Sequence, residues 1–160
     1  MQSIFPFFEW CEKTAIYNAV ATHEWAYPAL ETFHLFGLTL LLGTMLLLSL
    51  RLMGVIFQRQ PVAELAADLA PYQDTGLILM AVTGPLMFVA TAVRCYGNTS
   101  FWVKMILFVL AMIFHFAYFR KLVRRDDASI GPGAAKLAAM AALALWFGVG
   151  VAGRSIGFFG

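Results

Sequence analysis

The sequence predicts an all-α integral membrane protein, a bundle of four transmembrane helices with an amphipathic interfacial helix at its N-terminus. Of the 160 residues, 61% are hydrophobic and 12% are charged, whereas soluble domains contain about 45–50% apolar and about 25% charged residues. Four stretches reach the roughly 20 mostly apolar residues that a spanning helix needs: approximately residues 26–50, 74–94, 102–122 and 135–157. This composition excludes soluble and disordered proteins, and we expect a single membrane domain over residues 1–160.

The first fifteen residues are expected to form the interfacial helix. Their apolar side chains recur at helical spacing on the face opposite Glu9, Glu12 and Lys13, which is typical of an amphipathic helix lying in the membrane interface; the apolar residues are Ile4, Phe7, Phe8, Cys11 and Ala15. A solvated helix packed on the bundle fits the same pattern. No Lys or Arg precedes the apolar residues, so a cleaved signal peptide is not expected.

Glycine and proline mark the connections and the irregular points of the spans. Residues 58–72, with Pro61 and Pro71, predict a short surface helix between turns. Gly84-Pro85 predicts a kink within the second span. Small residues in the fourth span would let a neighbouring helix approach closely; they include Gly148, Gly150 and Gly153.

The distribution of basic residues predicts the orientation. One side of the membrane would carry seven of them, Arg51, Arg59, Arg120, Lys121, Arg124, Arg125 and Lys136, and the other side four, Lys13, Arg94, Lys104 and Arg154. Because the richer side stays in the cytoplasm, we expect a bacterial inner-membrane protein with both termini in the periplasm. Cys11 and Cys95 would then lie near an oxidising compartment, where one disulfide is possible although free cysteine is commoner. The net charge of +2 is too small to indicate nucleic acid.

Histidines are the main candidates for chemistry. His23 precedes the first span, whereas His34 lies within the first span and His115 within the third. Ionisable groups inside a membrane are costly, so His34 and His115 are expected to face the bundle interior. Two imidazoles on separate helices are the minimum for an axial pair on haem iron. At 1.5 Å per residue they would lie roughly 12 Å and roughly 20 Å deep, which permits a shared ligand without requiring one.

Each histidine also has a simpler interpretation, because it could merely hydrogen-bond to Glu31, to a threonine or to a backbone carbonyl. Lys104 lies eleven residues before His115 and therefore on nearly the same helix face. It is a candidate partner for a haem propionate, together with Arg94 and Arg154 at that side of the membrane. It could equally anchor the span by snorkelling.

Two residues of the first span complete the candidate set. Gly37, beside His34, begins a line of positions that would leave room for a flat ligand, although helix packing is the commoner use of such glycines. Arg51, at the other end of the span, would be nearest to propionates that pointed inward.

The stretch from His34 to Arg51, HLFGLTLLLGTMLLLSLR, and the pattern of Trp102, Lys104 and His115 before a basic cluster resemble known membrane proteins. They are similar to the small four-helix haem-binding proteins grouped with the copper-resistance protein D family, which include the HemJ type of protoporphyrinogen oxidase. The resemblance covers two of the four helices, and YPALETFH and AGRSIGFF are closer to an uncharacterised bacterial branch. It implies one haem b held by His34 and His115.

The sequence therefore predicts a bis-histidine haem b protein that transfers electrons within the membrane. It would act alone, as a homo-oligomer or as a small subunit of a bioenergetic complex. Three alternatives stay open: a HemJ-like oxidase of a porphyrinogen, a haem-free accessory or copper-handling protein, and a pigment protein using one histidine. An enzyme of this kind would be a haem-dependent oxidoreductase.

Overall fold

The computed structural model describes residues 4–124 and 131–158, and every regular element within those ranges is helical. Four segments are long and apolar enough to cross a membrane. They are α3 (Ala26–Leu52), α4 (Val62–Ala90), the run of α6 (Thr99–Phe114), η1 (His115–Phe119) and α7 (Arg120–Leu122), and α8 (Pro132–Ser155). The shortest have 24 residues and measure about 36 Å at 1.5 Å per residue, which exceeds the roughly 30 Å of a bilayer core. The all-α class with four candidate spans is confirmed.

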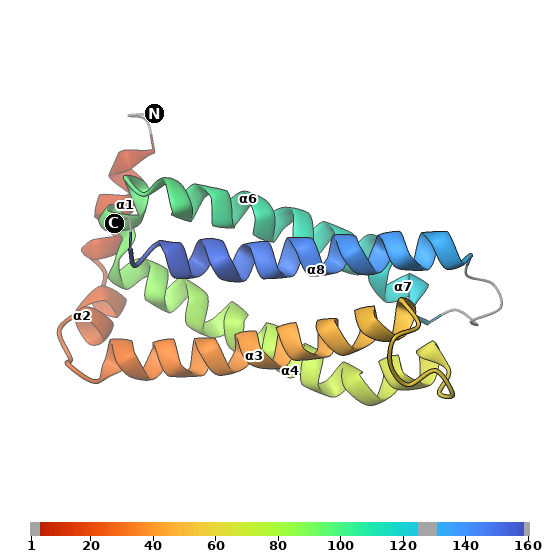
Figure 1. The fold of residues 1–160 in the computed structure, drawn as a ribbon. Helices are drawn as coiled ribbons and strands as arrows, with labels where there is room; N and C mark the ends of the chain where they lie inside the picture. The colour runs from red at the N-terminus through yellow and green to blue at the C-terminus, as the bar shows by residue number, and fades with distance from the viewer. Residues whose placement is uncertain (1–3, 125–130, 159–160) are drawn as a thin grey trace.

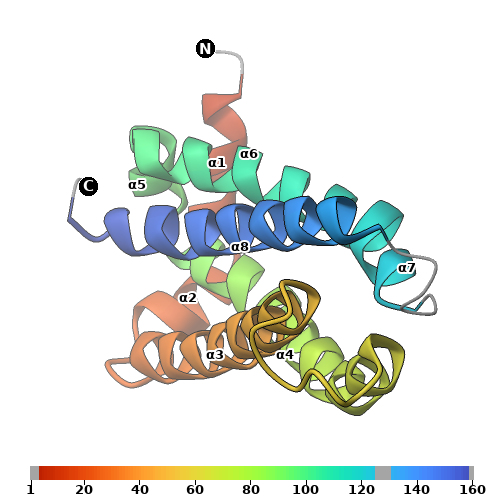
Figure 2. The same cartoon turned by 45° about the vertical axis from the view of Figure 1, so that its right-hand side comes forward.

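The four spans form two layers of paired helices. α3 packs on α4, α6 packs on α8, and α8 also packs on α3, so that the pair α6/α8 lies over the pair α3/α4 (Figure 2). In the described ranges, α4 and α6 are not among the closely packed pairs. We call the boundary between these two helices the α4–α6 seam.

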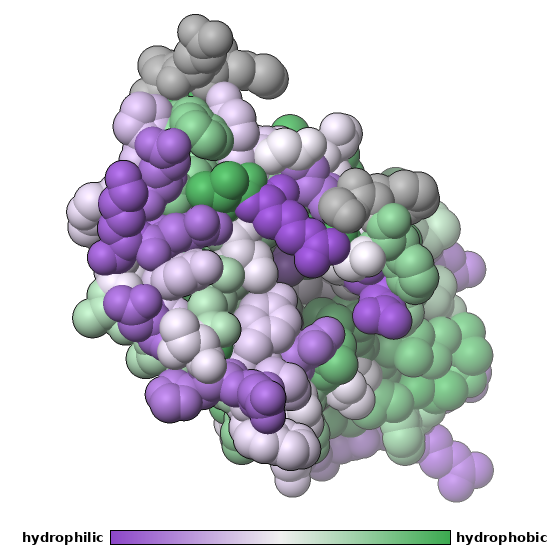
Figure 3. All heavy atoms as spheres, turned by 90° about the vertical axis from the view of Figure 1, so that its left-hand side faces the viewer, coloured by the Kyte–Doolittle hydropathy of each residue, from purple (hydrophilic) through white to green (hydrophobic). Residues whose placement is uncertain are grey.

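The two ends of the bundle differ. The N- and C-terminal parts of the chain lie together at one end, with α1 (Phe5–Glu12), α2 (Ala15–Ala21) and α5 (Ala92–Tyr96) (Figure 1). We call it the terminal end. The opposite end, which carries the connector of residues 53–61, is the loop end. Hydrophilic side chains gather over the terminal end, with hydrophobic ones beside them (Figure 3).

The expected N-terminal helix is interrupted. α1 ends at Glu12. Thr14 caps α2, because its hydroxyl accepts a hydrogen bond from the Tyr17 N–H at 3.3 Å. Phe8 and Cys11 of α1 are buried against α5 and Phe101, so α1 packs on the bundle. Trp10, by contrast, is 62% exposed, and its contact with a membrane interface stays a prediction.

The expected boundaries of the second span and its separate surface helix are wrong. A single helix, α4, begins after Pro61 and continues through Pro71 and Pro85 to Ala90. It starts early because Val62, Leu65 and Ala66 belong to the buried core of the loop half. The helix ends at Thr91, whose φ of −137° is not helical, and the kink expected at Gly84-Pro85 stays a prediction.

Both ends of the bundle are fixed by specific hydrogen bonds. At the loop end, Gly54 adopts φ +74°, and the Val55 N–H donates to the Leu50 carbonyl at 2.9 Å, which ends α3 in the manner of a glycine-terminated helix. At the terminal end, Asn98 caps α6 by accepting from the Ser100 N–H and donates to the Ile156 carbonyl at 3.1 Å. The side chain of Asn98 thus joins the start of α6 to the end of α8.

Candidate functional site

His34 presents one ring nitrogen in a defined state. Its Nδ1 lies 2.8 Å from the Thr83 hydroxyl of α4, and that hydroxyl donates its own proton to the Leu79 carbonyl at 2.6 Å. Since the hydroxyl proton is committed, His34 Nδ1 must be the donor to Thr83, and Nε2 keeps a free lone pair. A histidine oriented through its other nitrogen in this way is prepared to bind a metal or to accept a hydrogen bond.

Lys104 of α6 reaches the same region. It lies close enough to His34 for their charges to interact, and its stem lies against Gly153 of α8, where an added Cβ would be 3.3 Å from Lys104 Cε. Within residues 4–124 and 131–158 we find no hydrogen bond or ion pair that engages its ammonium. We call His34, Thr83 and Lys104 the polar layer, and with Gly153 beside them all four spans contribute to it.

His115 occupies a contrasting environment. It is the first residue of the π-helical turn η1 and is 0% exposed. Its ring lies edge-on to Trp146, with centroids 6.0 Å apart, and stacks on Phe119 at 6.2 Å. Both ring nitrogens, and the Trp146 indole nitrogen, are buried without a hydrogen-bond partner among the described residues. Such groups are expensive to leave unpaired, and π turns are frequent at functional sites.

The structure does not bring His34 and His115 together. Gly148 and Gly150 of α8 fix the relative levels of the other helices, because Gly148 faces Leu107 of α6 while Gly150 faces Leu38 and Leu42 of α3. His34 lies four residues before Leu38 and His115 eight residues after Leu107. Gly150 lies two residues nearer to the terminal end than Gly148. As α3 and α6 run in the same direction, the two histidines are offset by about 21 Å along the bundle.

This offset exceeds the roughly 8 Å estimated from the sequence. Two imidazoles on one iron, each bonded at about 2 Å, require helices that present them at nearly the same level. His34 belongs to the terminal half and His115 to the loop half. An axial pair made by these two residues therefore does not fit this arrangement.

Gly37 has a packing role rather than the expected ligand slot. A Cβ added there would lie 2.9 Å from Leu79 Cβ and 3.0 Å from the Gly76 carbonyl oxygen. The space beside Gly37 is filled by α4, because the two glycines let the backbones of α3 and α4 cross closely. The sequence pattern of α3 alone does not reveal where α4 crosses it, so the ligand slot expected beside Gly37 could not be distinguished from helix packing.

The cations expected around the cofactor lie at different ends. Arg51 donates from Nε to the Gln60 carbonyl at 2.7 Å and fixes the connector at the loop end. At the terminal end, Arg94 is exposed, and Arg154 is exposed with its guanidinium 5.1 Å from the Phe158 ring centroid. Among the expected cations only Lys104 interacts with a candidate histidine of the terminal half.

Sequence reasoning missed the role of Arg120, which it treated as one of a basic cluster. Arg120 pairs with Asp74 of α4 at 3.0 Å, and both charges are close enough to His115 to interact with it. The signal available was the position of Arg120 about one turn after His115. It is the charged pair nearest to the buried histidine.

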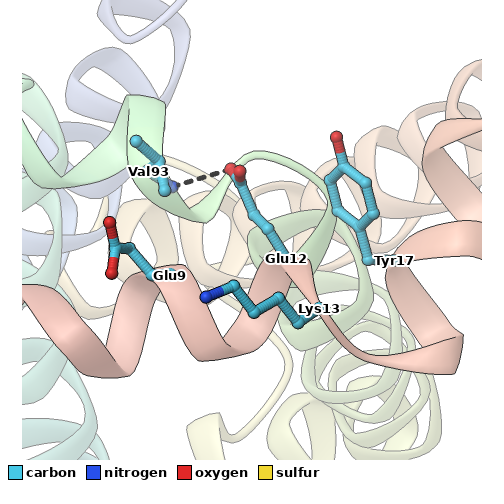
Figure 4. A pocket seen from close by; sticks show the side chains of 5 residues that line it. All are labelled: Glu9, Glu12, Lys13, Tyr17 and Val93. Carbon is cyan, nitrogen blue, oxygen red and sulfur yellow. Dashed lines mark hydrogen bonds between the residues drawn. The ribbon is translucent and has the colours of Figure 1, made fainter.

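The terminal end holds a pocket and two thiols. Cys11 and Cys95 are both free and buried in one cluster, so the structure does not form the disulfide considered from the sequence, and burial raises the pKa of the Cys95 thiol. Nearby, Glu9, Glu12, Lys13 and Tyr17 line an open pocket (Figure 4). Glu12 accepts from the Val93 N–H at 3.0 Å, a contact that attaches α1 to α5.

The donor set limits the kind of metal that the chain could hold. Among the described residues no group of three or more His, Cys, Asp and Glu side chains is placed to bind a metal ion. A haem supplies four nitrogens of its own and needs only one or two protein ligands. An unpaired imidazole such as His115 fits this requirement.

Fold and site together define a class: a bundle of four helices that are long and apolar enough to span a membrane, with a candidate histidine in each half. Residues 7–159 match the family of unknown function DUF6644, and the chain belongs to that family. No curated protein and no solved structure matches the chain. The resemblance to the copper-resistance protein D and HemJ groups therefore stays a prediction.

Proposed function

We propose that this protein is a membrane-embedded b-type haem protein that moves electrons within the bilayer, with His115 as the axial ligand. The observation that carries the proposal is the state of His115, which is fully buried at a π turn and whose two ring nitrogens have no partner in the part of the chain that the structure describes. A neutral imidazole in a dry aromatic environment is a common haem ligand. When bound, the haem would supply reversible one-electron transfer.

Charged residues near His115 support the proposal. The propionates of a haem need cations or hydrogen-bond donors, and Arg120 is the cation close to His115, at the loop end of the α4–α6 seam. Arg51 lies at the same end. The seam, where α4 and α6 are not closely packed, is the side on which a macrocycle could approach the histidine.

The setting of the proposal is a bacterial inner membrane with both termini in the periplasm, as the basic residues predict. Exposed apolar side chains on the spans, such as Phe36, Ile78 and Ile106, support contact with lipid. Further subunits or a second copy of the chain would cover part of this surface in a larger redox complex.

The test is the optical spectrum of the full chain purified in detergent from haem-replete cells. We expect a dithionite-reduced α band and a pyridine haemochrome of b type, both lost in His115→Ala and both retained in the control His23→Ala, since His23 is exposed at the terminal end. A wild-type protein without a Soret band would overturn the proposal. In that case metal analysis of the same sample would decide for or against copper.

A further inference from the structure

We infer that the polar layer of His34, Thr83 and Lys104 binds the head group of a membrane-soluble quinone or quinol. The inference rests on the proposed function, because a haem protein embedded in the bilayer can exchange electrons with a carrier that is dissolved in the membrane. The binding itself can be measured without haem.

The first argument is the pairing of an acceptor with a donor. His34 Nε2 carries a free lone pair because Nδ1 donates to Thr83, and the Lys104 ammonium has no hydrogen bond or ion pair within the described residues. A quinol offers hydroxyl donors, which suit His34, whereas a quinone offers carbonyl acceptors, which suit Lys104. The two side chains together can recognise both redox forms of one head group.

The second argument is depth. His34 lies eight residues inside α3, about 12 Å from the end of that helix. A phospholipid head group would stay nearer to the membrane surface, where its charge is hydrated. A quinone ring is apolar apart from its oxygens and can occupy this level, with each oxygen placed at a polar side chain.

The third argument is access and room. His34 and Lys104 are each only partly buried, and in the described ranges α4 and α6 are not among the closely packed pairs. Side chains close the α4–α6 seam at both ends, through the Phe88–Phe101 stack at 5.5 Å and the Asp74–Arg120 pair. Glycines stand beside both polar side chains, since a Cβ at Gly84 would be 3.5 Å from His34 Cε1.

The binding experiment uses the full chain in detergent and decylubiquinone as the probe. A ligand that binds only the folded state raises the midpoint of thermal unfolding as its concentration increases. Circular dichroism would measure this midpoint. We expect the dissociation constant for decylubiquinone to rise at least about tenfold in Lys104→Met and in His34→Ala, because each variant loses a charge-assisted or buried hydrogen bond. Lys104→Arg, which keeps the cation, should bind more tightly than Lys104→Met, and the exposed Lys136→Met should bind like the wild type.

Two outcomes would overturn the inference: equal binding by wild type and Lys104→Met, or no binding by a wild type that keeps its helicity. A rise in the thermal midpoint with laurate but not with decylubiquinone would also overturn the inference and would assign the polar layer to a carboxylate ligand. His115→Ala, which lacks the proposed haem ligand, should still bind the quinone. Quinone binding with no haem spectrum in the wild type would therefore overturn the proposed function and leave this inference intact.

Discussion

The two halves of the bundle place their histidines in opposite surroundings. In the loop half, His115 is enclosed by Trp146 and Phe119, and within residues 4–124 and 131–158 neither ring nitrogen has a hydrogen-bond partner. In the terminal half, His34 is partly exposed, has one nitrogen fixed by Thr83 and has a cation nearby. Equal residues on similar helices thus acquire different chemistry, because packing decides which nitrogen is free and what can reach it.

The crossing of α3 and α4 separates the halves and should give the largest effect on stability. In Gly76→Ala the new Cβ would lie 2.7 Å from the Gly37 carbonyl oxygen, so the helices must move apart at a cost of about 1–3 kcal/mol. Gly43→Ala is the matched control, because nothing lies within 4 Å of its added Cβ. Its free energy of unfolding should rise by up to about 1 kcal/mol, since alanine favours a helix more than glycine does. Denaturant unfolding in detergent measures both, and equal effects would refute the close crossing.

The two histidines should respond with opposite signs to removal of their imidazoles in haem-free protein. His115→Leu replaces an unpaired buried imidazole with an apolar side chain, so the free energy of unfolding should stay the same or rise by up to about 2 kcal/mol. His34→Leu loses the hydrogen bond to Thr83, so its free energy of unfolding should fall by about 1 kcal/mol. The same unfolding assay tests the pair, and a large loss in His115→Leu would reveal a partner for that ring.

Thr83 sharpens the comparison within the polar layer. Thr83→Val keeps the shape but removes the hydroxyl that accepts from His34 Nδ1, so we expect a loss of about 1 kcal/mol and a mixture of imidazole tautomers. The ¹⁵N chemical shifts of the His34 ring would report the tautomers directly. Thr39→Val is the control, because Thr39 hydrogen-bonds only within its own helix, to the Leu35 carbonyl.

The ion pair at the loop end of the seam should have the smallest effect. Asp74 and Arg120 are 44% and 25% exposed, so solvent screens their attraction and Asp74→Asn should cost less than about 1 kcal/mol. The difference in free energy of unfolding between the wild type and Asp74→Asn should shrink further in high salt. Unfolding at low and high ionic strength checks this expectation, and a cost that salt leaves unchanged would argue against a screened pair.

Much of the fold follows from local sequence, and the relative levels of the helices do not. The class and the four spans were predictable because each span is a long apolar run bounded by polar residues. The early start of α4 was missed because Pro61 and Pro71 were interpreted as turn signals. In the structure Pro61 is the N-cap of α4 and Pro71 lies inside the helix, while Val62 and Leu65 are buried in the core.

The candidate residues could be named from the sequence, but their arrangement relative to one another could not be predicted from it. Lys104 and His115 were expected on one face of their span, and both do contact α8, at Gly153 and Trp146. The offset between His34 and His115 depends on contacts between α8 and the helices on either side of it, such as Gly148 with Leu107. Distances along one helix carry no information about such contacts.

The central claim is that His34 and His115 serve different ligands. The most direct test is the reduced-minus-oxidised spectrum of His34→Ala beside that of His115→Ala, each purified as the full chain from haem-replete cells. We predict that His115→Ala loses the α band while His34→Ala keeps it at wild-type stoichiometry. Loss of the band in both variants, with helicity retained, would contradict the claim and would restore the two histidines as an axial pair.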